Sequence, residues 1–262
     1  MKKTIAYLIT CCLLITSCGL PVRTVMVRGS GNVVNETRQI KDISRVELAT
    51  IGTLVVIQDE EESLEVTGED NILPYLSSIV RGGNLVIQFQ EGVNILPSKD
   101  LVYILKVKEL NGISVTSAGG IQAEAISTDN LSIDVSSAGG ILIGQAQISN
   151  LQVRISSAGG VKIDQLQGDY LDVHLSSSGS LTAAGKVEEQ RVDISSSGSY
   201  QGGDLESSKA IVNISSSGDA QIWVNRSLDV NLSSSGDVEY YGDPQLSQRI
   251  SSSGKVISLG SH

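Results

Sequence analysis

Serine beside glycine recurs through the second half of this chain, and a serine held in a sharp turn can act as a catalytic nucleophile. Eight copies of one phrase, an aliphatic residue followed by small residues and a glycine, include ISSAGG at 155–160 and ISSSGD at 214–219. A serine hydrolase presents its nucleophile on a G-x-S-x-G elbow and needs a base beside it. The sequence has no such elbow, and eight equivalent serines cannot all be nucleophiles.

Histidine supplies the base of most such sites, and it is scarce here. The chain has two histidines, His174 and His262, and His174 belongs to a column of variable polar residues that we interpret as solvated. There is no H-E-x-x-H sequence, EF-hand loop or calcium-binding nonapeptide repeat. Asp219 and Asp237 each follow a phrase glycine, but other copies have serine or lysine at that position. We therefore expect no catalytic residues, no metal site and no cofactor.

The phrase recurs at a nearly constant interval, which indicates the elements that position it. Self-similarity at a period near 20 residues is typical of stacked repeats, whereas a flexible linker has no reason to keep such spacing. The phrase glycines lie 18 to 20 residues apart, at Gly119, Gly139, Gly159, Gly179, Gly198, Gly218, Gly236 and Gly254.

Each repeat alternates apolar and polar residues before its glycine. The positions four and six residues before the glycine are aliphatic in every copy except at Gln248, and the position between them is polar. This period of two predicts a strand, and such short units bury their apolar faces only when stacked. We predict an all-β fold, a single-stranded parallel β-helix with about eight regular coils of 18–20 residues over 111–262. The usual chirality of parallel crossovers favours the right-handed sense.

The outward carboxylates of one column lie too far apart for glycoside cleavage. Asp134 and Asp193 share the position five residues before the glycine but are three coils apart, about 14 Å at strand spacing. The carboxylates of a glycosidase lie within about 9.5 Å of each other. This spacing argues against an enzyme.

The second serine of each phrase is predicted to point inward, because it continues the inward alternation. An inward hydroxyl is costly unless it is hydrogen-bonded, so we predict a corner ladder in which these serines bond to backbone groups or to each other. The glycine that follows is expected to supply the positive φ of a tight corner. The predicted ladder comprises Ser117, Ser137, Ser157, Ser177, Ser196, Ser216, Ser234 and Ser252.

One aromatic pair stands out in the repeats. Trp223 and Tyr241 each lie five residues after a phrase glycine, in adjacent coils, and Gln221 and Glu239 lie two residues earlier. Stacked strands would bring the two rings to about 5 Å spacing. Two rings beside an amide and a carboxylate could stack on a sugar or anchor a protein partner. The alternative is that the rings cover the C-terminal end of the core.

The first residues indicate a secreted, lipid-anchored protein. Two lysines precede an apolar run at 5–15, which is shorter than the about 20 residues of a membrane-spanning helix, and residues 1–17 are predicted to be a signal peptide. The sequence ITSC at 15–18 resembles a bacterial lipobox, which implies cleavage before Cys18 and acylation of that cysteine. Residues 18–30 would form a lipidated tether, so the membrane is a partner through the lipid.

Cleavage before Cys18 leaves a strongly acidic chain without a thiol for disulfide or metal chemistry. Seventeen basic and 29 acidic residues remain, which argues against nucleic acid or an anionic lipid surface as a partner. The predicted location is the bacterial cell envelope, at the outer membrane. The lack of acidic residues at 19–30 favours its periplasmic face, with the cell surface as the alternative. The oligomeric state stays open.

Residues 31–110 are β-rich but less regular, and we predict that they cap the N-terminal end of the coils. A covered edge prevents pairing with another chain. The run EDNILPYLSSIV at 69–80 is the one helical candidate, with Asp70 or Asn71 as its cap. Three glutamates at 60–62 are predicted at the tip of a hairpin between the runs TLVVIQ and SLEVTG.

The order of these segments resembles a known family. Arg38, the run EDNILPYL and the run LNGISVTSAGG at 110–120, followed by serine–glycine coils, are similar to the family named putative auto-transporter adhesin, head GIN domain, over residues 35–258. The resemblance implies a bacterial envelope lipoprotein with a β-helical fold. It implies no catalytic residue.

Three functions are compatible with this sequence. The predicted function is a non-catalytic envelope lipoprotein, an adhesin-like module that presents flat β-helix faces to a glycan or a protein partner. The first alternative is a self-associating scaffold, because β-helix rods can stack end to end. The second alternative is a pectinase-like, polysaccharide-active enzyme. Fold analogy alone does not choose among them.

Overall fold

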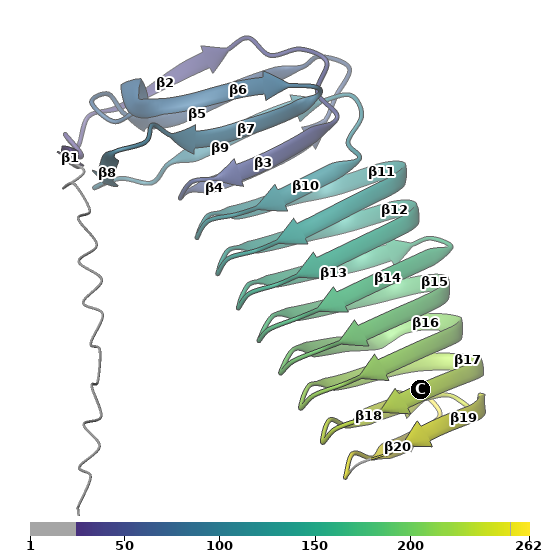
Figure 1. Ribbon diagram of the computed structural model, residues 1–262. Coiled ribbons are helices and arrows are strands. Elements are labelled where there is room, and N and C mark those ends of the chain that lie inside the picture. The colour runs from purple at the N-terminus through teal and green to yellow at the C-terminus, as the bar shows by residue number, and fades with distance from the viewer. Residues whose placement is uncertain (1–24, 252) are drawn as a thin grey trace, which may run out of the picture.

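The chain forms one stack of strands that widens at its N-terminal end (Figure 1). The computed structural model describes residues 25–251 and 253–262, so the predicted signal peptide, Cys18 and Ser252 lie outside the described residues. Strands make up 68% of the structure. In the described part there is one 3-10 turn, η1 (Leu73–Tyr75), and no helix is long and apolar enough to span a membrane.

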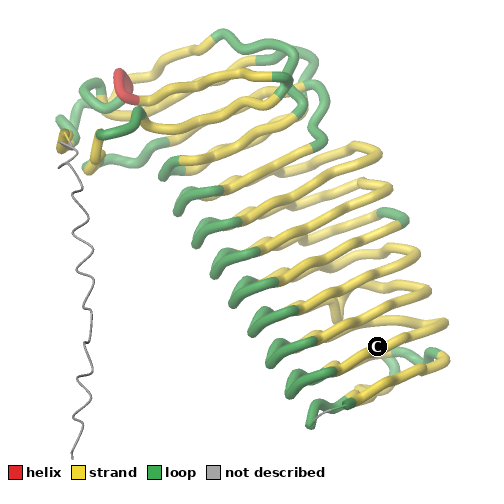
Figure 2. The backbone as a smooth tube through the Cα atoms, viewed as in Figure 1, coloured by secondary structure: helices red, strands yellow, loops and turns green. Residues whose placement is uncertain are grey.

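The repeats form stacked coils whose turns align along one edge (Figure 2). Neighbouring coil strands pair in parallel with the register of the repeat, so that Ile133 lies beside Val153. The prediction of stacked parallel coils is confirmed, and the eight phrases enclose about seven turns. The coil strands are β10 (Gly112–Val115), β11 (Gly120–Val135), β12 (Gly140–Ile155), β13 (Gly160–Gln167), β14 (Tyr170–Leu175), β15 (Ser180–Ile194), β16 (Ser199–Ile214), β17 (Asp219–Leu232), β18 (Val238–Tyr241), β19 (Gln245–Ile250) and β20 (Val256–Gly260).

The N-terminal strands precede the first phrase. They are β1 (Val25–Arg28), β2 (Val33–Arg38), β3 (Arg45–Ala49), β4 (Thr53–Gln58), β5 (Ser63–Glu69), β6 (Leu76–Arg81), β7 (Asn84–Phe89), β8 (Val93–Leu96) and β9 (Val102–Val107). Most of them belong to the same sheet as the coils, whereas β1 and β8 form a separate two-stranded sheet. β3 pairs in parallel with β10, and β4 pairs in parallel with the first half of β11. The first regular coil therefore has hydrogen-bonding partners on its N-terminal side.

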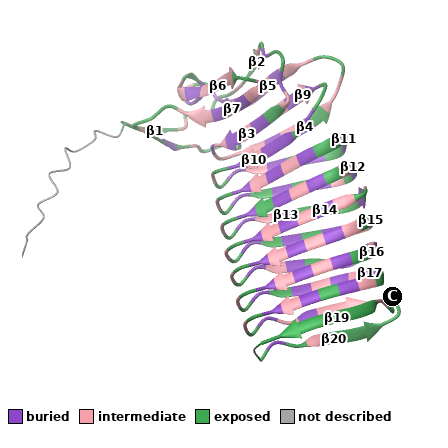
Figure 3. Cartoon of the chain, turned by 45° about the vertical axis from the view of Figure 1, so that its right-hand side comes forward, coloured by how far each residue is buried: buried purple, intermediate pink, exposed green. Residues whose placement is uncertain are grey.

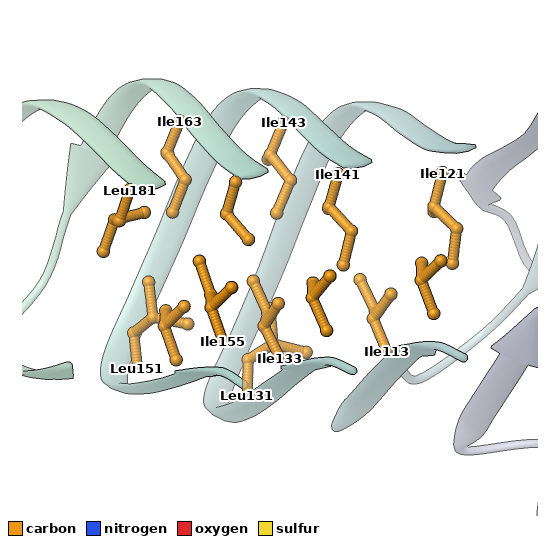
Figure 4. Packing of buried hydrophobic residues seen from close by; sticks show 14 of the residues in the cluster. Ile113, Ile121, Leu131, Ile133, Ile141, Ile143, Leu151, Ile155, Ile163 and Leu181 are labelled. Atoms are coloured by element: carbon orange, nitrogen blue, oxygen red, sulfur yellow. The ribbon is translucent and has the colours of Figure 1, made fainter. Parts of the chain in front are cut away.

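Aliphatic columns fill the interior of the coils. In Figure 4 the side chains of Ile121, Ile141 and Ile163 face those of Ile113, Ile133 and Ile155 across the core. Along most of the coil strands up to β17, buried residues alternate with half-buried or exposed ones (Figure 3). Each fully buried aliphatic side chain contributes about 1.5–3 kcal/mol relative to an exposed one, so the repeated columns stabilise the stack. The columns of buried aliphatic residues end at β19, where all six residues are exposed.

The phrase glycines have a different role from the one predicted. None of the eight adopts a positive φ, so the expectation of a left-handed corner is wrong. A Cβ on Gly139 would instead lie 2.5 Å from Cγ1 of Val115 and 2.6 Å from the carbonyl oxygen of Ser117, and it would also strike the carbonyl oxygen of Gly119. Glycine is required because the preceding coil leaves no room for a side chain.

The predicted helix at 69–80 is wrong. Only η1 forms there, and its N-cap is Ile72, which makes no side-chain cap bond. Leu76 already begins β6 because the following residues pair antiparallel with β7. Asp70 and Asn71 bind the loop before β2 rather than a helix end, since the Ser30 hydroxyl donates to Asp70 at 2.6 Å and the Ser30 backbone N–H donates to Asn71.

The predicted hairpin at 60–62 is also wrong. β4 and β5 are consecutive in the chain, but β9 lies between them, parallel to β4 and antiparallel to β5. The glutamates therefore occupy a crossover connection. Glu62 accepts hydrogen bonds from the backbone N–H groups of Asp42 and Ile43, at 2.6 and 3.1 Å.

Candidate functional site

The aromatic pair lies on the outward side of the last coils. Trp223 in β17 is the register partner of Tyr241 in β18, and Gln221 is the partner of Glu239. The residues on either side of Trp223 are fully buried, whereas Trp223 itself is half-buried, so strand alternation places its ring outside the core. Gln221 Nε2 donates to Glu239 Oε2 at 3.2 Å. The structure therefore brings the four predicted residues together.

His262 completes this aromatic group. Its imidazole lies flat on the Trp223 indole, with ring centroids 4.0 Å apart and planes inclined by 8°. It meets the Tyr241 ring edge-on, at 5.0 Å and 79°. His262 Nε2 lies 3.3 Å from Oδ1 of Asp204, and because a carboxylate only accepts hydrogen bonds, the imidazole N–H is the donor. We call Trp223, Tyr241 and Asp204, the three residues that this imidazole contacts, the aromatic notch.

The surroundings of the notch are acidic and rich in amides. Glu206 in β16 is the register partner of Trp223 on the side away from Tyr241. Its carboxylate accepts a hydrogen bond from Asn225 at 3.2 Å and pairs with Lys186 at 3.2 Å. Together with Glu239 and Asp204 it makes this region acidic, within a chain whose formal net charge is −10. Such a surface repels anions and offers acceptors to hydroxyl or ammonium donors.

A buried polar network holds the backbone of Trp223. Gln190 is fully buried and donates through Nε2 to the Leu205 carbonyl oxygen at 3.0 Å and to Ser207 Oγ at 2.9 Å. Its Oε1 accepts the Tyr200 hydroxyl at 2.6 Å, and Ser207 Oγ donates to the Trp223 carbonyl oxygen at 2.9 Å. Burial raises the pKa of Tyr200, so its hydroxyl keeps its proton. A satisfied network in a low dielectric is rigid, and it fixes the strand that carries the indole.

The repeat is broken beside Trp223. The register of β16 and β17 shifts between Gly202 and Glu206, which leaves the intervening residues without register partners in β17. Gly203 lies against Gln221, and a Cβ on Gly203 would come within 3.0 Å of the Gln221 Cδ. This bulge carries Asp204 to the place where His262 reaches it.

Sequence reasoning missed Asp204 and His262 as members of the site. Asp204 belongs to no regular column, because the bulge displaces it from the repeat. His262 contacts residues from three different coils, and no local pattern predicts such contacts. The one available signal was QGG at 201–203, which interrupts the alternation after Gly198.

Elsewhere on the coils, a furrow of about 530 Å³ crosses six of them. One wall is the outward column five residues before the phrase glycine, and the first serines of the phrases line the other. Asn213 donates to Asp193 at 2.6 Å, and Asn231 donates to Asn213 at 2.9 Å. These groups satisfy one another, and the described lining contains no tryptophan, tyrosine or phenylalanine. The furrow is a polar brace between coils rather than an aromatic binding site.

His174, which was predicted to be a solvated side chain, is 41% exposed and also lies between two carboxylates in this region. Its Nε2 is 3.1 Å from Asp172 and its Nδ1 is 3.5 Å from Asp193. The three could offer ligand atoms within 4.8 Å of one another to a metal ion. Arg191 already lies 3.0 Å from Asp193, and Gln152 donates to Asp172 at 3.1 Å. A guanidinium repels a cation, so the group suits a cross-link between coils.

The same group corrects the argument from carboxylate spacing. Asp172 belongs to the next outward column, and its carboxylate and that of Asp193 come within 4.8 Å of each other. Distance alone therefore does not exclude a glycosidase pair. The imidazole of His174 stands between the two carboxylates, where a glycosidic bond would have to lie.

The serines of the predicted corner ladder are half-buried wherever the structure describes them. Ser117 and Ser137 donate their hydroxyls to carbonyl oxygens of the preceding coil, those of Thr50 and Ser117. Ser177 donates to the Ser156 carbonyl oxygen at 3.1 Å. The hydroxyls of some later members have no hydrogen bond to the described residues, namely those of Ser157, Ser196 and Ser216. Ser234 also belongs to the half-buried column.

We expect the cost of losing a ladder hydroxyl to depend on this bonding. Ser137→Ala should destabilise the protein by about 1 kcal/mol, because the hydroxyl bonds to the coil beside it. Ser216→Ala is the matched control and should change stability by less than about 0.5 kcal/mol. Urea denaturation followed by circular dichroism measures both. Equal losses would show that the hydrogen bond of Ser137 contributes nothing.

The chain matches the sequence profile of one known family. The profile of the family described as "Putative auto-transporter adhesin, head GIN domain" matches residues 42–244. No curated protein was found to match the chain.

Solved structures share the fold. A "putative lipid binding protein" from Parabacteroides distasonis has a TM-score of 0.84 and 24% identity, covering 89% of this chain and 99% of that one. A "putative adhesin" from Parabacteroides merdae has a TM-score of 0.84 and 20% identity, covering 90% of this chain and 100% of that one. A "putative adhesin" from Parabacteroides distasonis has a TM-score of 0.85 and 20% identity, covering 89% of this chain and 100% of that one. At these identities the likeness shows the fold.

Proposed function

Because this chain belongs to the family described as "Putative auto-transporter adhesin, head GIN domain", we propose that it is a non-catalytic envelope lipoprotein that binds a glycan through the aromatic notch. One observation carries the proposal. The Trp223 indole faces outward and already holds a flat ring, the His262 imidazole, at 4.0 Å. A pyranose ring also has flat C–H faces, and such a face can pack on an indole as the imidazole does.

The polar groups around the notch support a sugar as the ligand. Sugar hydroxyls both donate and accept hydrogen bonds, and the pair formed by Gln221 and Glu239 offers both kinds of group. The buried network of Gln190 holds the Trp223 strand in place before any ligand arrives. A preorganised site loses less conformational entropy on binding.

A non-catalytic role agrees with the titratable groups of the coils. The carboxylates of Asp172 and Asp193 are engaged by His174, Arg191 and neighbouring amides. A general acid and a base need free access to the substrate. We infer binding without turnover.

Replacing Trp223 by alanine should weaken glycan binding about tenfold or more, because ring stacking supplies the main contact area. The melting temperature should change little, since the ring lies outside the aliphatic core. Glycan-array binding and thermal unfolding measure the two effects. Tyr170→Ala, at another half-buried aromatic residue that does not contribute to the notch, is the control. Unchanged array binding, or a large loss of stability, would reject the notch as the binding site.

Replacing Cys18 by alanine should release the protein from the membrane. The lipobox-like sequence at 15–18 motivates this change, and Cys18 lies outside the described residues. Without acyl chains, no helix of the described residues is long and apolar enough to anchor the acidic chain. Membrane fractionation and palmitate labelling in the native host measure the effect. A variant that still fractionates with membranes and still incorporates palmitate would reject the lipid anchor.

The face of the outer membrane on which the protein lies can be tested on intact cells. We propose that the anchored protein faces the periplasm, on the ground that residues 19–30 carry no acid. Whole cells treated with protease should then retain the full-length protein, while lysed cells lose it. Cleavage on intact cells would place the notch at the surface, where it could contact an external glycan.

A self-associating scaffold is the second candidate, and one observation favours it. The last two strands expose apolar side chains at the open end of the stack, at Leu246, Ile250, Ile257 and Leu259. Strands at the edge of a sheet with exposed apolar residues promote pairing with another chain. Sedimentation of the purified protein at rising concentration separates the candidates, because a scaffold forms concentration-dependent oligomers.

A further inference from the structure

The notch is filled by a side chain of the same molecule. His262 follows β20, and its imidazole stacks on Trp223 while it donates to Asp204. The His262 side chain is 33% exposed, because the indole and the phenol cover part of it. A ring ligand and this imidazole cannot occupy the same face of Trp223 together.

The imidazole shows which contacts the notch offers. It uses one flat face on the indole, one edge contact with the phenol of Tyr241, and one N–H donor directed at a carboxylate. A pyranose can reproduce this set with a C–H face toward Trp223 and a hydroxyl or amino group toward Asp204. The sugar group that faces Asp204 must be a hydrogen-bond donor, because the Asp204 carboxylate accepts hydrogen bonds and does not donate them.

The charge of the surroundings selects among sugars. Asp204, Glu206 and Glu239 contribute three carboxylates, and Lys186 pairs with Glu206. A uronic acid or a phosphorylated sugar would bring an anion beside these groups, which is unfavourable. An uncharged pyranose is tolerated, and an ammonium substituent is attracted.

The segment that carries His262 is weakly held. β20 pairs with β18 alone among the described strands, and four of its five residues are exposed. The Gly260 carbonyl accepts a hydrogen bond from Gly242 N–H at 2.9 Å, and beyond it the hydrogen bonds and ring contacts to described residues are those of the His262 side chain. Displacement of the imidazole therefore breaks few other contacts.

We propose that the aromatic notch binds a non-acidic pyranose, uncharged or amino-substituted, in the place of the imidazole, and that His262 competes with it as an intramolecular ligand. This inference rests on the proposed glycan-binding function and adds the class of sugar and the regulation of the site. Ligand binding requires release of the segment after Gly260. The observed affinity equals the intrinsic affinity multiplied by the fraction of molecules in which the notch is open.

Trp223 is the one tryptophan of the chain, so its fluorescence reports on the notch directly. In the absence of ligand, His262→Ala should increase acrylamide quenching of Trp223, because the stacked ring is gone. Ser261→Ala, at the neighbouring residue in the same segment, is the control and should leave quenching unchanged. Equal quenching in His262→Ala and the parent protein would overturn the competition without reference to any glycan.

Binding is tested by titrating three trisaccharides, those of N-acetylglucosamine, glucosamine and galacturonic acid, into each variant. The first two should bind and the acidic one should not. His262→Ala should bind them roughly 2- to 10-fold more tightly than the parent, the range given by one aromatic contact. In the His262→Ala background, Asp204→Ala should weaken binding again.

The outcomes separate the two proposals. Preference for the galacturonic acid trisaccharide, absence of binding by both other trisaccharides, or an unchanged affinity in His262→Ala overturns this inference. If His262→Ala leaves the affinity unchanged while Trp223→Ala still weakens glycan binding on the array, the proposed function stands without the competition. If Trp223→Ala binds as well as the parent, both are wrong.

Discussion

Replacing Gly139 by alanine is expected to destabilise the protein by roughly 2–3 kcal/mol, because the added methyl group overpacks the corner. Its Cβ would lie 2.5 Å from Val115 Cγ1 and 2.6 Å from the Ser117 carbonyl oxygen, and it would also strike the Gly119 carbonyl oxygen. Backbone atoms cannot rotate away as a flexible side chain can. The coil must therefore move away from its neighbour, which strains the hydrogen bonds on both sides.

The next residue provides a matched control. Gly140 begins β12, and a Cβ there would meet only the Gly160 carbonyl oxygen, at an ordinary 3.5 Å. Gly140→Ala should leave stability within about 0.5 kcal/mol, or raise it slightly, since alanine is less costly than glycine to order. Guanidinium denaturation compares the two variants. Similar losses at both positions would show that backbone freedom, rather than the contact between coils, requires the glycine.

Replacing Gln190 by leucine is expected to cost roughly 2–4 kcal/mol, although leucine is apolar and similar in size. The change removes the acceptor of the buried Tyr200 hydroxyl and the amide donor to Leu205 and Ser207. A buried polar group without a partner loses its hydration and gains nothing in return. The same change should loosen the Trp223 backbone, whose carbonyl oxygen accepts from Ser207.

Two readouts check this prediction. Thermal unfolding gives the loss of stability, and the emission of Trp223 reports whether the notch has moved. Gln201→Leu is the control, because Gln201 is exposed and its side-chain amide bonds only to Ser199 Oγ among the described residues. A Gln190→Leu variant as stable as the parent would mean that water or rearranged side chains satisfy the network.

The aromatic notch lies where the repeat is irregular, and there is a physical reason for this. Regular coils present the same side-chain positions at every level, as the furrow does with its serines and amides. A site for one ring needs groups at different heights that converge on one point. The bulge in β16, the buried Gln190 and the return of His262 supply that asymmetry.

The sequence by itself determined the stack and its columns. Alternation and a period near 20 residues place Ile133 beside Val153 because each strand repeats the burial pattern of the one before it. The same period makes Trp223 and Tyr241 partners, since both are counted from their own phrase glycine. These features follow from local rules applied many times, so a single chain is sufficient to predict them.

Only the tertiary structure decided how the coils meet and what converges on the notch. The role of Gly139 depends on atoms of the preceding coil, not on its own φ. β4 and β5 are separated by β9 because a strand from later in the chain pairs with both. Asp204 and His262 are 58 residues apart and meet across a bulge. Contacts of this kind depend on where neighbouring coils lie in space, and a repeat pattern contains no such information where the repeat itself breaks.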